Sequence, residues 1–208
     1  CLMKIYFKDY NLFALITLSL IIRIVAVYYY GDYEIENEWE ILLNNLYYNN
    51  VLGYRSFDNN IIPSVYMPPL YVLFLFFLKL ISPENIEFVK IVLIFHVILS
   101  TLAILIFYHL SNFFFNKKWS IFNSLLFSIF PLNVYATTQI SSATLQIFLI
   151  TFYFYLFFLL HKSKKFNIKI IVFFSVISGF IMLLRGEFYL IFIISLLWLA
   201  IFKKINFK

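Results

Sequence analysis

Long apolar runs alternate with short polar segments along the whole chain, and the polar segments hold most of the charged residues. A membrane-crossing helix needs about 20 apolar residues, because each residue advances ~1.5 Å through ~30 Å of hydrocarbon. Four runs reach or approach this length, namely Asn11–Tyr30, Phe88–Leu110, Trp119–Ala136 and Thr144–His161. Two shorter runs of 15 residues each, Ile170–Leu184 and Phe188–Phe202, follow as a hairpin. The pattern predicts an all-α integral membrane protein with about six transmembrane helices.

A further apolar run, Pro69–Ser82, has only 14 residues and is bounded by Pro68 and Pro83. Basic residues of membrane proteins collect on the cytoplasmic side. If this run does not cross, eleven lysines fall on that one side: Lys4, Lys8, Lys117, Lys118, Lys162, Lys164, Lys165, Lys169, Lys203, Lys204 and Lys208. We therefore predict a multi-pass protein of the inner or plasma membrane with both ends cytoplasmic. Residues 68–83 form a non-spanning juxtamembrane helix, and residues 31–67 form an outward acidic loop with an amphipathic surface helix.

Composition narrows the class further. The chain is 63% hydrophobic and 12% charged, with a mean hydropathy of +0.92. The net charge is +6, and the basic residues that produce it lie between the apolar spans. Membrane orientation therefore explains the charge, and a nucleic-acid partner is not expected. A single cysteine excludes an intramolecular disulfide and a cysteine metal cage. We expect residues 1–208 to be one transmembrane domain and, because Cys1 stands where Met is usual, a fragment of a longer enzyme.

The outward loop gathers six of the ten acids of the chain, which are Asp32, Glu34, Glu36, Glu38, Glu40 and Asp58. Apolar residues follow at helical spacing from Trp39 to Leu46, which predicts the surface helix. Acids at a helix start are favoured by the helix dipole alone, so part of the cluster has a structural explanation. Glu36 and Glu38 are the preferred candidates for chemistry.

Arg185 is the second candidate, within LLRGEFYL at the turn of the short hairpin. Arginine below the membrane surface costs ~3 kcal/mol or more unless it is paired or hydrated, and it can bind a phosphate through two parallel hydrogen bonds. The structural alternatives are a pair with Glu187 and snorkelling to the interface. Snorkelling explains Arg23 equally well, and His96 lies alone in an apolar helix. No metal or organic cofactor is expected, and no HExxH, GxSxG or Walker sequence is present.

Four segments in this order resemble a known family: ENEWEILLNNL at Glu36–Leu46, VLGYRS at Val51–Ser56, MPPLY at Met67–Tyr71 and LLRGEFYL at Leu183–Leu190. Together they resemble the N-terminal half of GT-C membrane glycosyltransferases of family 39, the protein-mannosyltransferase and aminoarabinose-transferase group. The resemblance implies a GT-C-like fold and transfer of a sugar from a polyprenyl-phosphate donor to a lipid, glycan or protein acceptor on the outer face.

The resemblance also assigns residues. The family's catalytic Asp-Glu pair falls on Ile35-Glu36, so the Asp is missing, and Glu36 or Glu38 takes its role, with Asp32 as a further catalytic candidate. The lipid phosphate of the donor would contact Arg185. The remaining candidate substrate-binding residues are Glu187, Arg55 and Tyr71. Ser141 and Ser142 stand where many relatives carry a second acid, which argues against a metal-assisted mechanism.

The residues alone leave two other classes of protein open. A transporter or lipid-handling protein would show acids within the membrane and discontinuous helices in two related halves. A structural membrane subunit would use the acidic loop to bind a partner. Neutralising Glu36 and Glu38 would then change assembly and not turnover.

Overall fold

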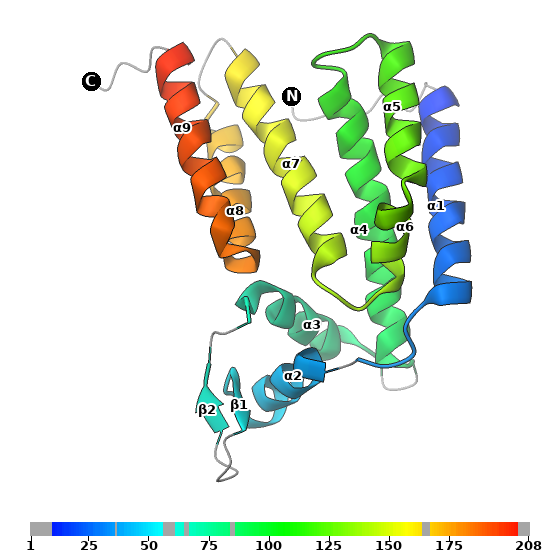
Figure 1. Ribbon diagram of the computed structural model, residues 1–208, viewed down its shortest axis with the longest axis vertical. Helices are drawn as coiled ribbons and strands as arrows, with labels where there is room; N and C mark the ends of the chain where they lie inside the picture. The colour runs from blue at the N-terminus through cyan, green and yellow to red at the C-terminus, as the bar shows by residue number, and fades with distance from the viewer. Residues whose placement is uncertain are drawn as a thin grey trace.

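The computed structural model describes residues 10–35, 37–55, 61–64, 67–83, 86–163 and 167–203. Its main body is an upright bundle of helices, and a smaller group of elements lies across one end of the bundle (Figure 1). The bundle helices are α1 (Tyr10–Tyr30), α4 (Phe88–Ser111), α5 (Lys117–Ile129), α6 (Pro131–Thr138), α7 (Ala143–Lys162), α8 (Ile168–Leu184) and α9 (Tyr189–Lys203). A one-turn 3₁₀ helix, η1 (Gly186–Phe188), joins α8 to α9.

The smaller group contains α2 (Asn37–Asn49), β1 (Gly53–Arg55), β2 (Ile61–Pro63) and α3 (Pro69–Ile81). The two strands are antiparallel, with Tyr54 opposite Ile62. Proline at the first position of α3 suits a helix start, since that position needs no N–H donor. Figure 1 shows α3 lying across the end of the bundle, where it contacts α2, α4 and α8. With 13 residues it is one of the shorter apolar helices of the described chain.

Three described helices are long and apolar enough to cross a membrane: α1, α4 and α7. Helices α5 and α6 form a fourth span if counted together, although they are bent by 49° where Pro131 interrupts the backbone hydrogen bonds. Helices α8 and α9 are apolar but have only 17 and 15 residues. The expected number of six spans is therefore not confirmed, because the polar turn at Arg185 ends α8 early. The coarser expectation of an all-α membrane protein agrees with these helices.

The helix ends and the turns between helices fall into two groups, one at each end of the bundle. The start of α1, the α4–α5 turn, the end of α7, the start of α8 and the end of α9 lie together at one end of the bundle, away from α2 and α3 (Figure 1). Lys118, Lys162 and Lys169 belong to this end, because they lie in the first or last turn of their helices. Asp32 and Arg185 belong to the opposite end.

Apolar packing holds the bundle together around α4, α7 and α8. Tyr153 and Leu156 of α7 are fully buried against Ile181 of α8, and Leu75 of α3 joins the same cluster. Many large apolar side chains instead lie exposed on the outer faces, such as Ile94 and Ile194 at 56% and 63% exposure. A soluble protein rarely exposes apolar surface continuously, whereas a bilayer covers it.

Helix α5 packs closely because one of its faces carries only small residues. Ser120, Ser124 and Ser128 recur at every fourth position and are all fully buried. Small side chains let helix backbones approach within a membrane. This face brings the Ser128 carbonyl within 3.3 Å of Arg23 on α1.

Candidate functional site

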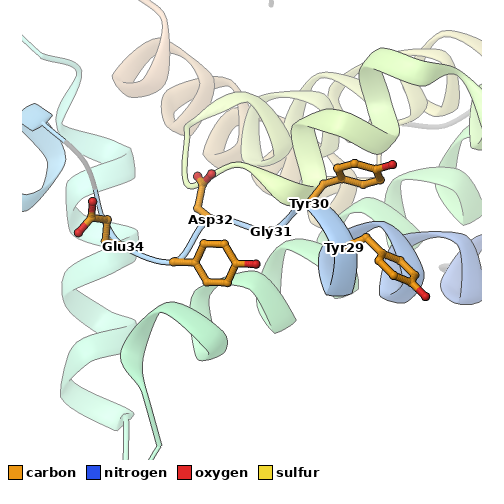
Figure 2. A pocket seen from close by; sticks show the side chains of 6 residues that line it. Tyr29, Tyr30, Gly31, Asp32 and Glu34 are labelled. Carbon is orange, nitrogen blue, oxygen red and sulfur yellow. The ribbon is translucent and has the colours of Figure 1, made fainter.

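The acid at the centre of the candidate site is Asp32, two residues beyond the end of α1. Its backbone N–H donates to the Thr138 carbonyl at 3.0 Å, and its Oδ2 accepts from the Ile140 N–H at 2.6 Å. Figure 2 shows the carboxylate pointing toward the α6–α7 turn, while Tyr29 and Tyr30 extend away from it along the last turn of α1. One hydrogen bond of the Asp32 backbone and one of its carboxylate thus fix this loop residue to the end of α6 and the α6–α7 turn.

Gly31 makes this placement possible because the backbone lies so close to its neighbours here that no side chain would fit. A Cβ at this position would lie 2.4 Å from the Val27 carbonyl oxygen and 3.2 Å from Cδ1 of Leu93. The Gly31 N–H also donates to that same carbonyl of Val27 at 2.9 Å. The chain therefore leaves α1 pressed against α4, and the next residue, Asp32, reaches the α6–α7 turn.

Tyr71 and His96 form the second part of the site. Both side chains are fully buried, and the Tyr71 hydroxyl lies 3.3 Å from Nε2 of His96. Trp39 of α2 packs edge-on against the Tyr71 ring, with 4.9 Å between ring centroids. Burial raises the pKa of Tyr71, and the negative charge of Asp32 raises it further. The phenol therefore stays protonated and acts as a hydrogen-bond donor or acceptor, never as a base at neutral pH.

Arg185 lies at the C-terminal end of α8, where the backbone becomes extended. Its Nε donates to Oε1 of Gln146 on α7 at 3.1 Å, and its side chain is exposed. Within the described part of the chain Arg185 makes no ion pair with a carboxylate, and Glu187 is exposed in the next turn. The guanidinium is thus oriented by Gln146, while its two terminal nitrogens face no described carboxylate.

One short segment connects the acid and the arginine. Asp32 is held by Ile140, and Arg185 is held by Gln146, six residues further along. Ile140 lies in the α6–α7 turn and Gln146 lies in the first turn of α7. Six residues span at most about 20 Å when fully extended, so one short segment holds both groups. The sequence predicts the acid in the outward loop and the arginine below the outer membrane surface, and the structure ties both to one short segment.

The other predicted site residues are placed as follows. Glu38 is exposed on α2, as is Glu40. Glu36 lies outside the described residues, and so does the side chain of Arg55, whose backbone belongs to β1. A hollow of about 300 Å³ beside Asp32 is lined by Tyr29, Tyr30, Gly31, Asp32, Tyr33 and Glu34 (Figure 2). The structure therefore favours Asp32 among the acids that it describes.

Sequence reasoning underrated three groups. His96 is not an isolated polar residue, because it contacts Tyr71 and lies beside the backbone of Gln139. The polar run from Thr137 to Thr144 is the signal for the turn that holds Asp32, although its spacing says nothing of that contact. Gln146 follows the run by two residues and orients Arg185.

Arg23 does not snorkel to the interface. Its side chain is 1% exposed inside the bundle. Its Nε donates to the Ser100 hydroxyl of α4 at 2.6 Å, and its Nη1 donates to the Ser19 hydroxyl at 3.0 Å and to the Ser128 carbonyl of α5 at 3.3 Å. This arginine joins three helices and lies apart from the Asp32 region.

The metal-ligating residue types do not cluster in the described ranges, where no group of three or more His, Cys, Asp or Glu side chains has the geometry of an ion site. Comparison of the chain with protein-family models, with curated proteins and with solved structures finds no match. The functional assignment below therefore rests on the residues, their geometry and the resemblance of the short segments.

Proposed function

We propose that this chain carries the active-site half of a GT-C membrane glycosyltransferase, which moves a sugar from a polyprenyl-phosphate donor to an acceptor on the outer face of the membrane. One observation carries the proposal. The Asp32 N–H donates to the Thr138 carbonyl and its carboxylate accepts from the Ile140 N–H, while Gln146 in the first turn of α7 orients Arg185. The acid and the arginine are thus held by one short segment, at the end of the bundle opposite Lys118, Lys162 and Lys169.

The proposed chemistry divides between these two groups. Asp32 acts as general base and takes the proton from the acceptor hydroxyl as its oxygen attacks the anomeric carbon. The bond between that carbon and the phosphate oxygen breaks, and the polyprenyl phosphate leaves with inversion at the sugar. Arg185 binds the phosphate through its terminal nitrogens and stabilises the negative charge that develops on the leaving oxygen.

Asp32 is proposed as the base in preference to Glu38 because the structure builds a site only around Asp32. A general base must be held within hydrogen-bonding reach of its proton. Glu38 is exposed on α2, and no side-chain hydrogen bond to a described residue holds it in place. Glu36 follows Asp32 by four residues and remains the second candidate.

The membrane orientation is part of the proposal. Lys118, Lys162 and Lys169 lie at one end of the bundle, which we assign to the cytoplasm. The acidic loop and α3 then lie on the outer side, where lipid-linked sugars of this class are used. Helix α3 rests in the interface with its apolar face against the bundle.

The alternative function, a transporter, would require acidic residues within the membrane-spanning helices. Helices α1, α4, α5, α6 and α7 contain no Asp or Glu. Coupled transport across a membrane commonly uses such intramembrane carboxylates to bind ions or protons.

The test is transfer of sugar by the complete encoded protein in proteoliposomes supplied with polyprenyl-phosphate sugars. Asp32→Asn should lower kcat by about 100-fold or more, the usual contribution of a general base. Arg185→Ala should lower kcat/KM for the donor, and Arg185→Lys should restore part of it. Glu38→Gln is the matched control on the same loop and should retain activity.

Two outcomes would redirect the proposal. Full activity of Asp32→Asn together with loss in Glu36→Gln would move the base to Glu36. Full activity in all variants, or saturable solute flux without consumption of lipid-linked sugar, would overturn the glycosyltransferase assignment.

A further inference from the structure

An apolar groove runs between α1 and α4 and ends at Asp32. Its volume is about 550 Å³, and its lining comes from Leu20 to Tyr33 and from Glu87 to Ile98. The buried side chains of Leu93 and Val97 form part of this lining, and the exposed side chains of Ile24 and Ile94 lie at its edge. The groove shares Gly31, Asp32 and Tyr33 with the polar hollow of Figure 2, so hydrocarbon and carboxylate surfaces are continuous.

The length of the groove matches one leaflet of a bilayer. Its helical lining extends over Leu20–Tyr28 of α1 and Val89–Ile98 of α4. At ~1.5 Å per residue these stretches are about 12–14 Å long, close to half of the ~30 Å hydrocarbon core. The groove also begins at the outer end of the bundle, where Tyr28 and Tyr33 resemble the tyrosines that mark a membrane interface. One hydrocarbon chain of the outer leaflet therefore fits its length and depth.

The apolar wall of the groove does not by itself make binding selective for one lipid. Lipid tails are as apolar as leucine, so their transfer from the bilayer to the groove gains little free energy. The charged side chains at the mouth, the outer end of the groove, can provide this selectivity. Among the described residues that line the groove and the adjoining hollow, three are acidic (Asp32, Glu34 and Glu87) and one is basic (Lys90). Lys90 is already paired with Glu87 at 2.9 Å. The negative charge of Asp32 and Glu34 remains, which repels a phosphate and favours a hydroxyl donor.

We propose that the α1–α4 groove binds one hydrocarbon chain of an uncharged lipid whose headgroup hydroxyl donates to Asp32. The charge at the mouth excludes the anionic polyprenyl phosphate from this groove. Donor and groove lipid are therefore different molecules, which approach the α6–α7 turn from the Arg185 side and from the Asp32 side. The assignment of this lipid as the sugar acceptor rests on the proposed function, whereas the binding site itself does not.

Photolabelling tests the site without requiring sugar transfer. The complete protein in phosphatidylcholine vesicles is irradiated with a long-chain alcohol that carries a diazirine in its tail, or with the matching alkyl phosphate. Labelled peptides are then identified by mass spectrometry. The alcohol should label α1 and α4 about tenfold more than the phosphate does, a difference equal to ~1.4 kcal/mol. Equal labelling by both probes would overturn the proposal.

Two variants separate groove binding from general contact with lipid. Ile94→Trp fills the groove and should abolish labelling of α1 and α4, whereas Ile194→Trp changes a similarly exposed isoleucine on α9 and should leave it intact. The double variant Asp32→Asn with Glu34→Gln should raise phosphate labelling to the level of the alcohol. Persistent labelling in Ile94→Trp, or no change in the double variant, would contradict the proposal.

The competing occupants have distinct results. If another helix of the same protein or a second copy covers the groove, a photoreactive amino acid at position 94 will cross-link to protein, and neither probe will label α1 or α4; this overturns the proposal. Labelling as expected in a protein that transfers no sugar supports the lipid site and counts against the proposed function alone.

Discussion

The contact between Arg23 and Ser100 gives a sharp test of how this bundle accommodates a buried charge. Arg23 is 1% exposed and Ser100 4% exposed, and the 2.6 Å hydrogen bond between them joins α1 to α4. Ser100→Ala would leave Nε of Arg23 without its described acceptor. An unsatisfied buried donor costs about 1–3 kcal/mol, and measured hydrogen bonds between membrane helices reach up to ~1.7 kcal/mol. We therefore expect Ser100→Ala to lower the free energy of unfolding by about 1–2 kcal/mol.

Arg23→Met should cost less than Ser100→Ala, although it removes more hydrogen bonds. Methionine fills a similar volume without a charge, and replacing buried charges by apolar residues is often neutral or stabilising. The freed Ser100 hydroxyl can bond to a carbonyl of its own helix one turn earlier. In the Arg23→Met background, Ser100→Ala should therefore change stability by less than about 0.5 kcal/mol, which makes the coupling free energy ~1 kcal/mol or more.

The assay is reversible unfolding in mixed micelles of increasing dodecyl sulfate content, followed by circular dichroism. Thr101→Ala is the matched control, because the Thr101 hydroxyl of α4 bonds within its own helix to the Val97 carbonyl at 2.8 Å. It should have the same effect in both backgrounds. Equal effects of Ser100→Ala with and without Arg23 would refute the idea that this bond carries the interhelical contact.

Two further predictions concern the Asp32 region. Gly31→Ala should lower the free energy of unfolding by about 1–3 kcal/mol, because the new methyl group would lie 2.4 Å from the Val27 carbonyl oxygen. Gly186→Ala is the control, since a Cβ there meets open space, and it should be nearly neutral in the same micelle assay. Tyr71 has an ordinary pKa of 10.0 that burial raises in the folded state, so the folded protein holds this proton longer and loses stability as pH rises above 10.0. In Tyr71→Phe the free energy of unfolding should therefore fall less steeply between pH 9 and ~11 than in the unmodified protein. Equal slopes of the free energy of unfolding against pH in the two proteins would contradict the prediction.

The hydrophobic pattern was a good guide to the helices of the bundle. The predicted run Phe88–Leu110 corresponds to α4 at Phe88–Ser111, and Thr144–His161 corresponds to α7 at Ala143–Lys162. The pattern was less reliable where a span is interrupted. Pro131 divides the predicted run Trp119–Ala136 into α5 and α6, and the short α8 and α9 do not add to the number of helices long enough to cross a membrane.

The candidate site shows the same division between local and long-range information. Excess acid in the loop and an arginine in the hairpin turn are visible in the sequence, and both lie at one end of the bundle in the structure. The sequence favoured Glu36 and Glu38 from their place at the start of the predicted surface helix and from the resemblance, which sets the family's acid at Glu36. The contact of Asp32 with Ile140 spans 108 positions, and no local spacing predicts such a contact.

The sequence by itself determined that this chain is apolar, helical and charged at its connections, because helix formation and membrane burial depend on residues close together in the chain. Only the tertiary structure decided which polar groups meet. Asp32 reaches the α6–α7 turn because Gly31 permits close contact with α4, and Arg185 reaches Gln146 in the first turn of α7 because α8 packs against α7. The groove beside Asp32 likewise exists only where two helices distant in sequence lie side by side.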